Sequence, residues 1–464
     1  MAKVLKPEGL CGAAVREITC ESMLSLGRAA AQALGKSCAH PPVFYISRDT
    51  RTGADVLEAA LSAGICIGGG VAHCLGVLPS SAMALLIEEE GAECGISLSG
   101  GMLPPPQIVV RFFAKSGLPM NAEQLDSIAA LLPASQADPK KQIGRIERPQ
   151  DAARRYLQRI ASLLNVNTPL YQYEQEKPLR IAVDCANGAV TPYAELLLRM
   201  LGTEPVMLSD MPDGQNICRE CGVNAMEALV STVKRTGCDA GFAFDGDGTR
   251  CLAVDGHGES VHGDRLLALL CADRVERQAE NKTLPIEATM QQGCAVTEAT
   301  NLGFLRYARE NGIPVHTAQP EPQFILERMR NLHLGLGGDS GGRIYFCDLP
   351  AADGLMTMAR VIRTMQRTRR PLSELASVME HDPQVSVSVR IPSYWCEIWK
   401  NDPEITAYIA KCQQELGMEG RLVVRERRGD AAIRIMLEGR DFRRINKYAF
   451  DVADVIQARI AETL

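Results

Sequence analysis

The chain has 464 residues, of which 46% are hydrophobic and 23% are charged, an ordinary balance for a globular protein. This length exceeds what one hydrophobic core supports, so three or four domains are expected. A net charge of −6 and an aromatic content of 5% argue against a basic surface and a base-stacking platform, so neither nucleic acid nor a membrane is expected as a partner.

Short apolar runs, each followed by a turn, recur along the chain. The runs at residues 42–46, 179–184 and 240–244 are typical of buried strands. Helical patterns follow the first two, at residues 54–63 and 192–201. This alternation predicts an α/β fold in which binding groups collect beyond the carboxyl ends of parallel strands.

Polar segments divide the chain. Residues 133–146 are polar and contain prolines, as is typical of a junction, and a helical pattern follows at residues 151–164. The charged segment at residues 367–372 is expected to form a hinge before a C-terminal domain. The predicted domains are residues 1–150, 151–255, 256–368 and 369–464.

The 16 cysteines are scattered, and many lie in apolar runs. No apolar secretory segment follows Met1, and no run reaches the roughly 18 apolar residues of a membrane helix. A cytoplasmic protein with reduced thiols is therefore expected. Cys218 and Cys221 form a C-x-x-C pair with only Cys238 nearby, which favours two thiols over a zinc site.

The first candidate loop lies in residues 95–113, where an apolar strand runs into Ser99-Gly100-Gly101. Ser97 and Ser99 are the only hydroxyls of this segment, and it contains no histidine or lysine. A serine nucleophile needs a base or a metal to activate it. The residues alone therefore favour a structural loop.

The second candidate loop, Asp245 to Arg250, follows a buried strand. Asp245 and Asp247 are separated by a glycine, so their oxygens can converge on a hard cation such as Mg²⁺. Two carboxylates and the hydroxyl of Thr249 are a weak ligand set for this ion. An acidic turn that ends a strand is the alternative.

The third candidate loop is glycine-rich and spans residues 335–346. Asp339, Ser340 and Arg343 lie within it and have the chemistry to bind sugar hydroxyls and phosphate. An ordinary surface turn has the same composition.

The fourth candidate loop lies in residues 421–434. Arg425, Arg427 and Arg428 surround Gly429 just before an apolar strand. Guanidinium forks and free backbone amides are suited to phosphate. A charged edge strand that resists aggregation is the alternative.

Taken in order, the four loops resemble those of the α-D-phosphohexomutases, most closely the bacterial phosphoglucosamine mutases. Those enzymes carry a phosphoserine loop, a D-G-D-G-D-R metal loop, a G-E-x-S-G-H sugar loop and an R-x-S-G-T-E-P phosphate loop. The resemblance implies three related mixed-sheet α/β domains and a smaller C-terminal α+β domain around a central cleft. It also implies phosphoryl transfer between an enzyme serine and a sugar phosphate, assisted by Mg²⁺.

The chain departs from this pattern at residues that carry the chemistry. The family's S-A-S-H-N-P falls on residues 99–104, so Gly101 stands where the phosphorylated serine is expected. Arg111 replaces a lysine and is a poorer proton donor because it stays charged. Thr249 replaces the third metal aspartate. The matching residues of the metal loop are Asp245, Asp247 and Arg250.

The sugar and phosphate loops also differ. Asp339 replaces a glutamate and Arg343 a histidine, with Ser340 between them, so these residues are expected to bind the substrate. The family's S-G-T falls on two arginines and a glycine, which exchanges hydroxyls for guanidiniums. The residues expected to bind phosphate are Arg425, Arg427, Arg428, Gly429 and Arg434.

Together, these departures favour a catalytically degenerate mutase with a ligand-binding or regulatory role in sugar-phosphate or cell-wall precursor metabolism. Its expected ligand is a sugar phosphate or nucleotide sugar, and Mg²⁺ binding is expected to be weak or absent. By resemblance, a homodimer or a heterodimer with an active mutase is expected.

Two alternatives stay open. One is an active mutase or phosphatase that uses a displaced hydroxyl, such as Ser99, on glucosamine phosphate or another hexose phosphate. Glycines at 100 and 101 would let the loop shift by the 6–7 Å that about two strand residues span. The other is an interaction protein that binds no small ligand.

Overall fold

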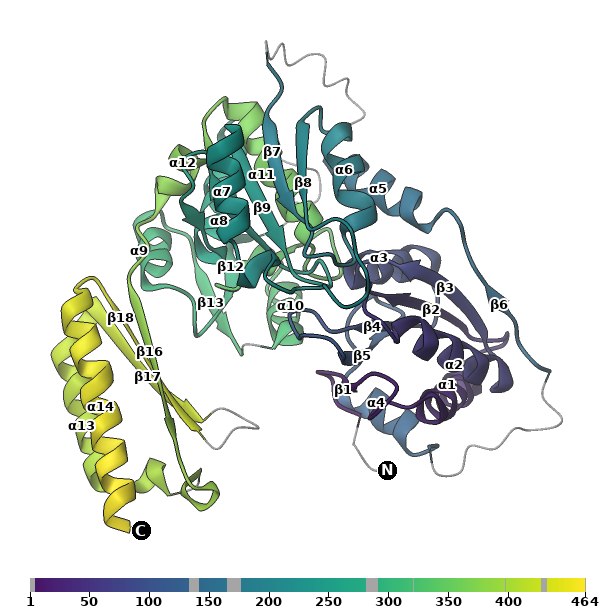
Figure 1. Cartoon of the computed structure of the whole chain (residues 1–464), viewed down its shortest axis with the longest axis horizontal. Coiled ribbons are helices and arrows are strands. Elements are labelled where there is room, and N and C mark those ends of the chain that lie inside the picture. Colours follow the sequence, from purple (N-terminus) through teal and green to yellow (C-terminus); the bar gives the residue numbers. More distant parts are fainter. Residues whose placement is uncertain are drawn as a thin grey trace. The chain divides into compact units, whose positions relative to one another are not determined.

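The computed structural model describes residues 5–132, 142–164, 177–280, 291–319, 321–396, 398–426 and 432–463. These residues form four β-sheets in two compact units (Figure 1). The first unit comprises Met1–Ala299 and Ile313–Val378, and the second comprises Thr300–Gly312 and Met379–Leu464. Three sheets are mixed and the fourth is small and antiparallel, which confirms the α/β class and the smaller C-terminal domain.

The N-terminal sheet has six strands in the order β1-β5-β4-β2-β3-β6. Strand β2 is parallel to β3 and β4, whereas β5 is antiparallel to β1 and β4. The strands are β1 (Leu10–Ala13), β2 (Val43–Arg48), β3 (Val71–Val77), β4 (Cys94–Ser99), β5 (Gln107–Ala114) and β6 (Ile146–Glu147), and the helices are α1 (Cys20–Leu34), α2 (Ala54–Ile67), α3 (Ser80–Glu90) and α4 (Ala122–Ala129).

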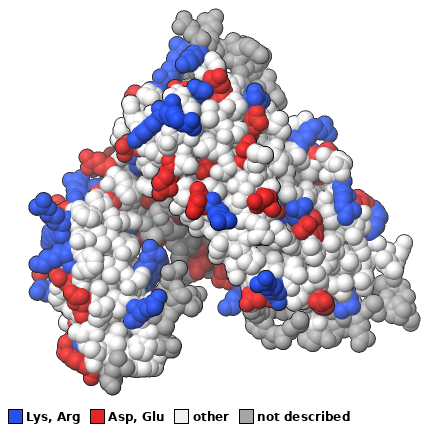
Figure 2. All heavy atoms as spheres, viewed as in Figure 1, with Lys and Arg blue, Asp and Glu red and all other residues white. Residues whose placement is uncertain are grey.

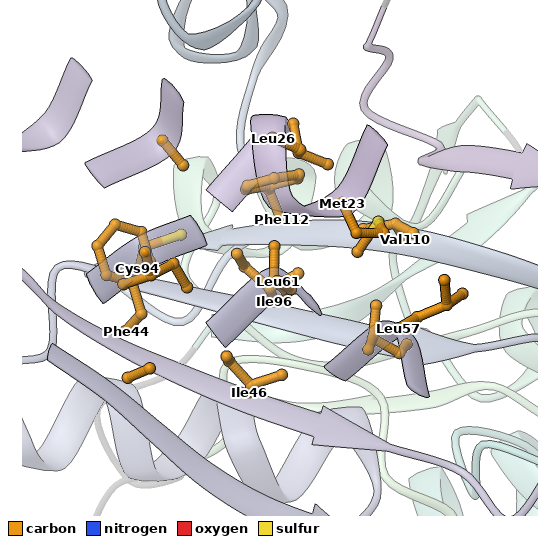
Figure 3. Packing of buried hydrophobic residues seen from close by; sticks show 14 of the residues in the cluster. Met23, Leu26, Phe44, Ile46, Leu57, Leu61, Cys94, Ile96, Val110 and Phe112 are labelled. Carbon is orange, nitrogen blue, oxygen red and sulfur yellow. The ribbon is translucent and has the colours of Figure 1, made fainter. Parts of the chain in front are cut away.

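Strand β4 is buried along its whole length because helices cover both of its faces. Figure 3 shows Ile96 of β4 packed among side chains of α1, α2, β2 and β5. Side chains alternate along a strand, so Gly95 faces the other way. A β-carbon at Gly95 would lie 2.1 Å from Ile87 of α3. The carboxyl end of β4 is therefore held firmly where it runs into the first candidate loop.

The second sheet has the order β11-β10-β9-β7-β8, and β7 is parallel to β8 and β9. Strand β10 is antiparallel to β9 and β11. The strands are β7 (Arg180–Asp184), β8 (Glu204–Leu208), β9 (Ala240–Phe244), β10 (Cys251–Asp255) and β11 (Ser260–Val261), and the helices are α5 (Ala152–Leu163), α6 (Thr191–Met200) and α7 (Glu227–Thr236). The strands predicted at residues 42–46, 179–184 and 240–244 are thus confirmed, as are the helices predicted at 54–63, 151–164 and 192–201.

The third sheet has the order β13-β12-β14-β15, with β12 parallel to β13 and β14 and only β15 antiparallel. The strands are β12 (Gln291–Thr297), β13 (Val315–Ala318), β14 (Leu334–Gly338) and β15 (Ile344–Phe346), and the helices are α8 (Gly263–Ala279), α10 (Pro322–Asn331), α11 (Gly354–Thr368) and α12 (Leu372–Leu375).

The second unit is built on the antiparallel sheet β16-β18-β17. Its core contains the buried Trp395 and Trp399. Helix α9 belongs to this unit because Arg306 pairs with Asp382, and the backbone of Leu302 donates to Glu438 at 2.8 Å. The elements are α9 (Leu302–Glu310), β16 (Gln384–Arg390), α13 (Pro403–Leu416), β17 (Gly420–Glu426), β18 (Ala432–Gly439) and α14 (Phe442–Thr463).

The charged segment at residues 367–372 is anchored rather than free. The guanidinium of Arg367 lies 2.9 Å from both Asp273 and Glu276 of α8, and 3.2 Å from Glu280. These ion pairs hold the end of α11 in the first unit, and the second unit resumes only at Met379. The arginines that suggested a hinge therefore bind a neighbouring helix. The domain boundaries expected from the sequence stay predictions.

Acidic and basic side chains are interspersed with uncharged ones on the face shown in Figure 2. Among the described helices, none has both the length and the apolar character needed to cross a bilayer.

Candidate active site

Three of the four candidate loops meet at one cavity of about 520 Å³ in the first unit. Gly100 to Leu103 follow β4, Asp245 to Arg250 follow β9, and Arg343 precedes β15. Arg111 of β5 also lines this cavity. The fourth loop belongs to the second unit, where Arg425 and Arg434 are exposed cross-strand partners. Arg427, Arg428 and Gly429 lie outside the described residues.

The hydroxyl of Ser99 is held beneath the first loop. Its Oγ donates to Asp49 at 3.0 Å and accepts from the backbone amide of Gly101 at 3.3 Å. Asp49 also accepts from the amide of Gly100 and forms an ion pair of 2.8 Å with the buried Arg51. Ser99 is 1% exposed and is not among the residues that line the cavity. Its contacts shape the loop.

Gly101 occupies the position of the expected nucleophile. It has a φ of +56°, in the left-handed region that glycine adopts without strain. Its carbonyl accepts from the amide of Gly246 at 3.2 Å and from the thiol of Cys218 at 3.3 Å. A β-carbon at this position would lie 3.5 Å from Oδ2 of Asp245. A side chain here would therefore point at the acidic loop, but glycine supplies no atom to phosphorylate.

The acidic loop is buried, and most of its oxygens are engaged. Asp245 accepts from the amide of Arg250 at 3.1 Å and from the hydroxyl of Thr249 at 3.3 Å. Burial and the nearby Asp247 raise the pKa of Asp245, and Arg250 opposes this shift. Oδ2 of Asp247 accepts from the Ser80 hydroxyl at 2.7 Å, whereas Oδ1 has no hydrogen-bond partner among the described residues.

Three guanidinium groups surround these two carboxylates. Nη1 of Arg111 lies 3.9 Å from Oδ2 of Asp247. Arg250 donates to the carbonyl of Gly341 at 3.0 Å, and both Arg250 and Arg343 interact electrostatically with Asp245. Burial lowers the pKa of Arg111, but arginine still stays charged near neutral pH. The cavity is therefore lined by fixed cations beside the acidic loop.

Only part of the third loop lines the cavity. Arg343 does so, whereas Asp339 and Ser340 are not among the lining residues. Oδ1 of Asp339 accepts from the amide of Arg343 at 3.0 Å, and its other oxygen lies 3.4 Å from the guanidinium. The carbonyl of Ser340 accepts from the amide of Gly263. In this geometry Asp339 orients Arg343, and Ser340 supports the turn.

The sequence reasoning missed several lining residues, among them the hydroxyl-bearing Ser80 and Tyr345. Ser80 begins α3 and donates to Asp247, but its segment has the ordinary composition of a helix start. Tyr345 lies in β15, is 1% exposed, and its hydroxyl has no partner among the described residues. Burial raises the pKa of Tyr345, so this hydroxyl keeps its proton. In the sequence both resemble ordinary structural residues, so no signal marked them.

Comparison with known proteins decides the family. Three models of the phosphoglucomutase/phosphomannomutase α/β/α domains match: domain I at residues 3–138, domain II at 154–258 and domain III at 262–381. The chain belongs to the phosphoglucomutase/phosphomannomutase family. Together the matches cover more than half of the chain, and each contains all or most of the strands of one mixed sheet.

Phosphoglucosamine mutases are among the relatives of this family member. That of Caldicellulosiruptor saccharolyticus is 31% identical, with 99% of this chain and 100% of the relative covered. That of Clostridium botulinum (strain Eklund 17B) is 34% identical with the same coverage. This confirms the resemblance to the α-D-phosphohexomutases.

Solved structures show the same fold. A phosphoglucomutase/phosphomannomutase family protein from Burkholderia thailandensis superposes with a TM-score of 0.78 at 19% identity, covering 98% of this chain and 97% of the other. A putative phosphomannomutase from Thermus thermophilus gives 0.76 at 17% identity, covering 98% and 100%.

Mg²⁺ is a cofactor in this family, and a structure of Aspergillus fumigatus N-acetylphosphoglucosamine mutase contains magnesium with GlcNAc-6P. The ion needs about six oxygen ligands in near-octahedral geometry. Here the hydroxyl of Thr249 donates to Asp245, and among the residues that the structure describes only one carboxylate oxygen of Asp245 and Asp247 lacks a partner. No group of three or more acidic, histidine or cysteine side chains suited to a metal occurs in the described ranges. With Arg111 beside Asp247, this donor set does not fit Mg²⁺.

Proposed function

We propose that this family member is a catalytically degenerate phosphohexomutase that binds a sugar phosphate without interconverting its isomers. The observation that carries the proposal is the position of Gly101. A side chain there would point at Asp245, where a phosphorylated residue would meet the metal loop, yet position 101 has only hydrogen. Without an acceptor oxygen, the phosphoryl group has no covalent carrier at this position.

The acidic loop supports the same proposal. Phosphoryl transfer depends on positioned positive charge that stabilises the moving group. In this chain that charge comes from guanidiniums, which can bind a phosphate but cannot replace an acceptor hydroxyl. A regulatory role in sugar-phosphate or cell-wall precursor metabolism follows as a prediction, as does pairing with a second copy or with an active mutase.

Ligand binding does not require every serine in proteins of this fold. A serine-to-alanine variant of the Aspergillus fumigatus enzyme has been solved in complex with glucose 1,6-bisphosphate. That protein therefore holds a sugar bisphosphate without that hydroxyl. We propose that the cavity of this chain likewise binds a sugar phosphate without a serine hydroxyl at residue 101. Such binding would distinguish the chain from an interaction protein that binds no small ligand.

An active mutase that uses another hydroxyl is the competing function. Ser99 is poorly placed for this role because it is buried and bonded to Asp49. Ser80 is better placed, since it lines the cavity and donates to Asp247, a carboxylate that could accept its proton. A phosphoryl group on Ser80 or Ser99 after incubation with glucose 1,6-bisphosphate, detected by peptide mass mapping, would support this alternative.

The deciding experiment is a mutase assay on the full chain. Glucosamine 6-phosphate, Mg²⁺ and a glucose 1,6-bisphosphate primer are supplied, and glucosamine 1-phosphate is measured. We expect no product above the protein-free blank, together with measurable heat of binding for glucose 1,6-bisphosphate in calorimetry. Turnover that Ser80→Ala or Ser99→Ala abolishes would establish the active mutase instead. If no sugar phosphate bound, the remaining hypothesis would be an interaction protein that binds no small ligand.

A further inference from the structure

The cavity contains hydrogen-bond donors that lack acceptors. The guanidinium of Arg111 approaches Asp247 at 3.9 Å and makes no hydrogen bond to any residue that the structure describes. Arg343 makes one long contact of 3.4 Å with Asp339. The Tyr345 hydroxyl has no partner in the described part of the chain. A guanidinium has five N–H donors, so most of the donors on these three side chains are unmatched.

The fold brings these donors to one wall from two sheets. Arg111 lies on β5, opposite Ser97 of β4 in the N-terminal sheet. Arg343 ends the β14–β15 turn of the third sheet and Tyr345 lies in β15, and both line the cavity. Residues two positions apart in extended chain point to the same side, which explains why these two side chains share a face.

The arrangement is costly without a ligand. Arg111 and Arg343 repel each other electrostatically, and their side chains are only 29% and 22% exposed. The buried hydroxyl of Tyr345 also lacks a partner among the described residues, and such buried donors are rare because they lose their bonds to water and gain nothing in exchange. An anion with several acceptor oxygens would satisfy the donors and screen the repulsion.

The size of the cavity fits such a ligand. Its volume of about 520 Å³ lies within the roughly 300–1,000 Å³ that is usual for small-molecule sites. Gly101 also lines the cavity, and its missing side chain leaves space beside Asp245. Guanidinium forks match the geometry of phosphate oxygens, which distinguishes phosphate from a neutral hydroxylated ligand.

We infer that Arg111, Arg343 and Tyr345 bind the phosphate group of a phosphorylated sugar directly, without a divalent cation. This inference deepens the proposed function and rests on it, because the phosphate is held at the former transfer site as a ligand. The guanidiniums take the place of the metal as the positive partner. Ligand binding is therefore independent of Mg²⁺.

The test is calorimetric titration of the full chain with glucose 1,6-bisphosphate, once with EDTA and once with Mg²⁺. We expect the same Kd in both buffers. Arg111→Gln and Arg343→Gln should each weaken binding about tenfold or more, since each removes charge-assisted bonds. Tyr345→Phe should weaken it about two- to tenfold. Arg199→Gln is the matched control, because Arg199 is exposed and lies outside the cavity. This variant should bind glucose 1,6-bisphosphate with the Kd of the unchanged chain.

Folding of the variants is checked by thermal unfolding. Should a glutamine variant fail to fold, Arg111→Lys and Arg343→Lys, which keep the charge but lose the fork, are expected to bind with intermediate affinity. Binding that requires Mg²⁺, or that is unaffected by both arginine changes in folded protein, overturns the inference but leaves the proposed lack of turnover intact. Turnover in the mutase assay refutes the proposed function instead, so the two failures are distinguishable.

Discussion

A β-carbon at Gly101 would lie 3.5 Å from Oδ2 of Asp245, although the two residues follow strands of different sheets. A serine at 101 would therefore place its hydroxyl next to the acidic loop. In the present chain that carboxylate accepts hydrogen bonds from the amide of Arg250 and the hydroxyl of Thr249. The missing hydroxyl at residue 101 is therefore one of the changes that distinguish this site from a metal-dependent one.

Restoring the family residues should create a response to Mg²⁺. The combined variant Gly101→Ser, Arg111→Lys, Thr249→Asp and Arg343→His supplies a third carboxylate and removes two guanidiniums. We expect its melting temperature to rise in millimolar Mg²⁺, because a ligand that binds only the native state stabilises it. Thermal unfolding with and without Mg²⁺ measures this effect.

The unchanged chain and the single variant Gly101→Ser are the controls for the restored site. Neither should respond to Mg²⁺, because Arg111 and Thr249 remain. The single variant should itself lose about 1–2 kcal/mol of stability, since serine is strained at a φ of +56°. Equal Mg²⁺ shifts in all three proteins would show that the arginines do not exclude the ion.

Ser99 is predicted to have a structural role. Ser99→Ala removes the donor to Asp49 and the acceptor for the amide of Gly101, both buried, so unfolding free energy should fall by about 1–3 kcal/mol. Urea denaturation measures the loss. Ser127→Ala is the control, because the hydroxyl of Ser127 is exposed and bonds only to its own helix. A change at Ser99 as small as that at Ser127 would contradict the role of this network.

A buried tyrosine–carboxylate pair should make stability depend on pH. Tyr156 donates to Asp353 at 2.7 Å, and Asp353 also accepts from the amide of Met356 at the start of α11. Burial raises the pKa of Asp353, whereas the bonds from Met356 and Tyr156 oppose the shift. A carboxyl whose folded pKa is raised contributes stability at low pH, and that contribution is lost as pH rises through the folded pKa.

Tyr156→Phe removes one of the opposing bonds and should raise the pKa of Asp353 further. The variant should be less stable than the unchanged chain by about 1–3 kcal/mol once Asp353 is ionised, and by less at acidic pH. Unfolding measured from about pH 4 to 8 tests this, with the exposed Tyr394→Phe as control. A difference that stays constant across this range would rule out ionisation of Asp353 as the cause.

The contact between α1 and α2 depends on a glycine. A β-carbon at Gly64 would lie 2.1 Å from the carbonyl oxygen of Leu24, so Gly64→Ala must push the two helices apart. We expect a loss of about 1–3 kcal/mol or more, as for other overpacked cores. Gly35→Ala is the matched control, because its nearest neighbour would be Pro42 at 3.6 Å. Similar melting temperatures for both variants would disprove the close approach.

Local patterns in the sequence determined the fold class. The apolar runs at residues 42–46, 179–184 and 240–244 are strands because several β-favouring side chains in a row are stable only when a sheet buries them. The spacing of the four loop motifs was enough to identify the family, since loop chemistry requires particular residues at particular positions. The absence of a hydroxyl at residue 101 was also visible in the sequence.

Only the tertiary structure decided which side chains face the cavity. Ser99 and Ser80 are both serines beside glycine or proline, yet Asp49 binds the first beneath the loop while Asp247 meets the second at the cavity. Tyr345 has the pattern of a core residue, but its hydroxyl joins Arg343 on the same wall. The direction of a side chain depends on partners that are far away in the sequence. These partners come into contact only after the sheets have packed.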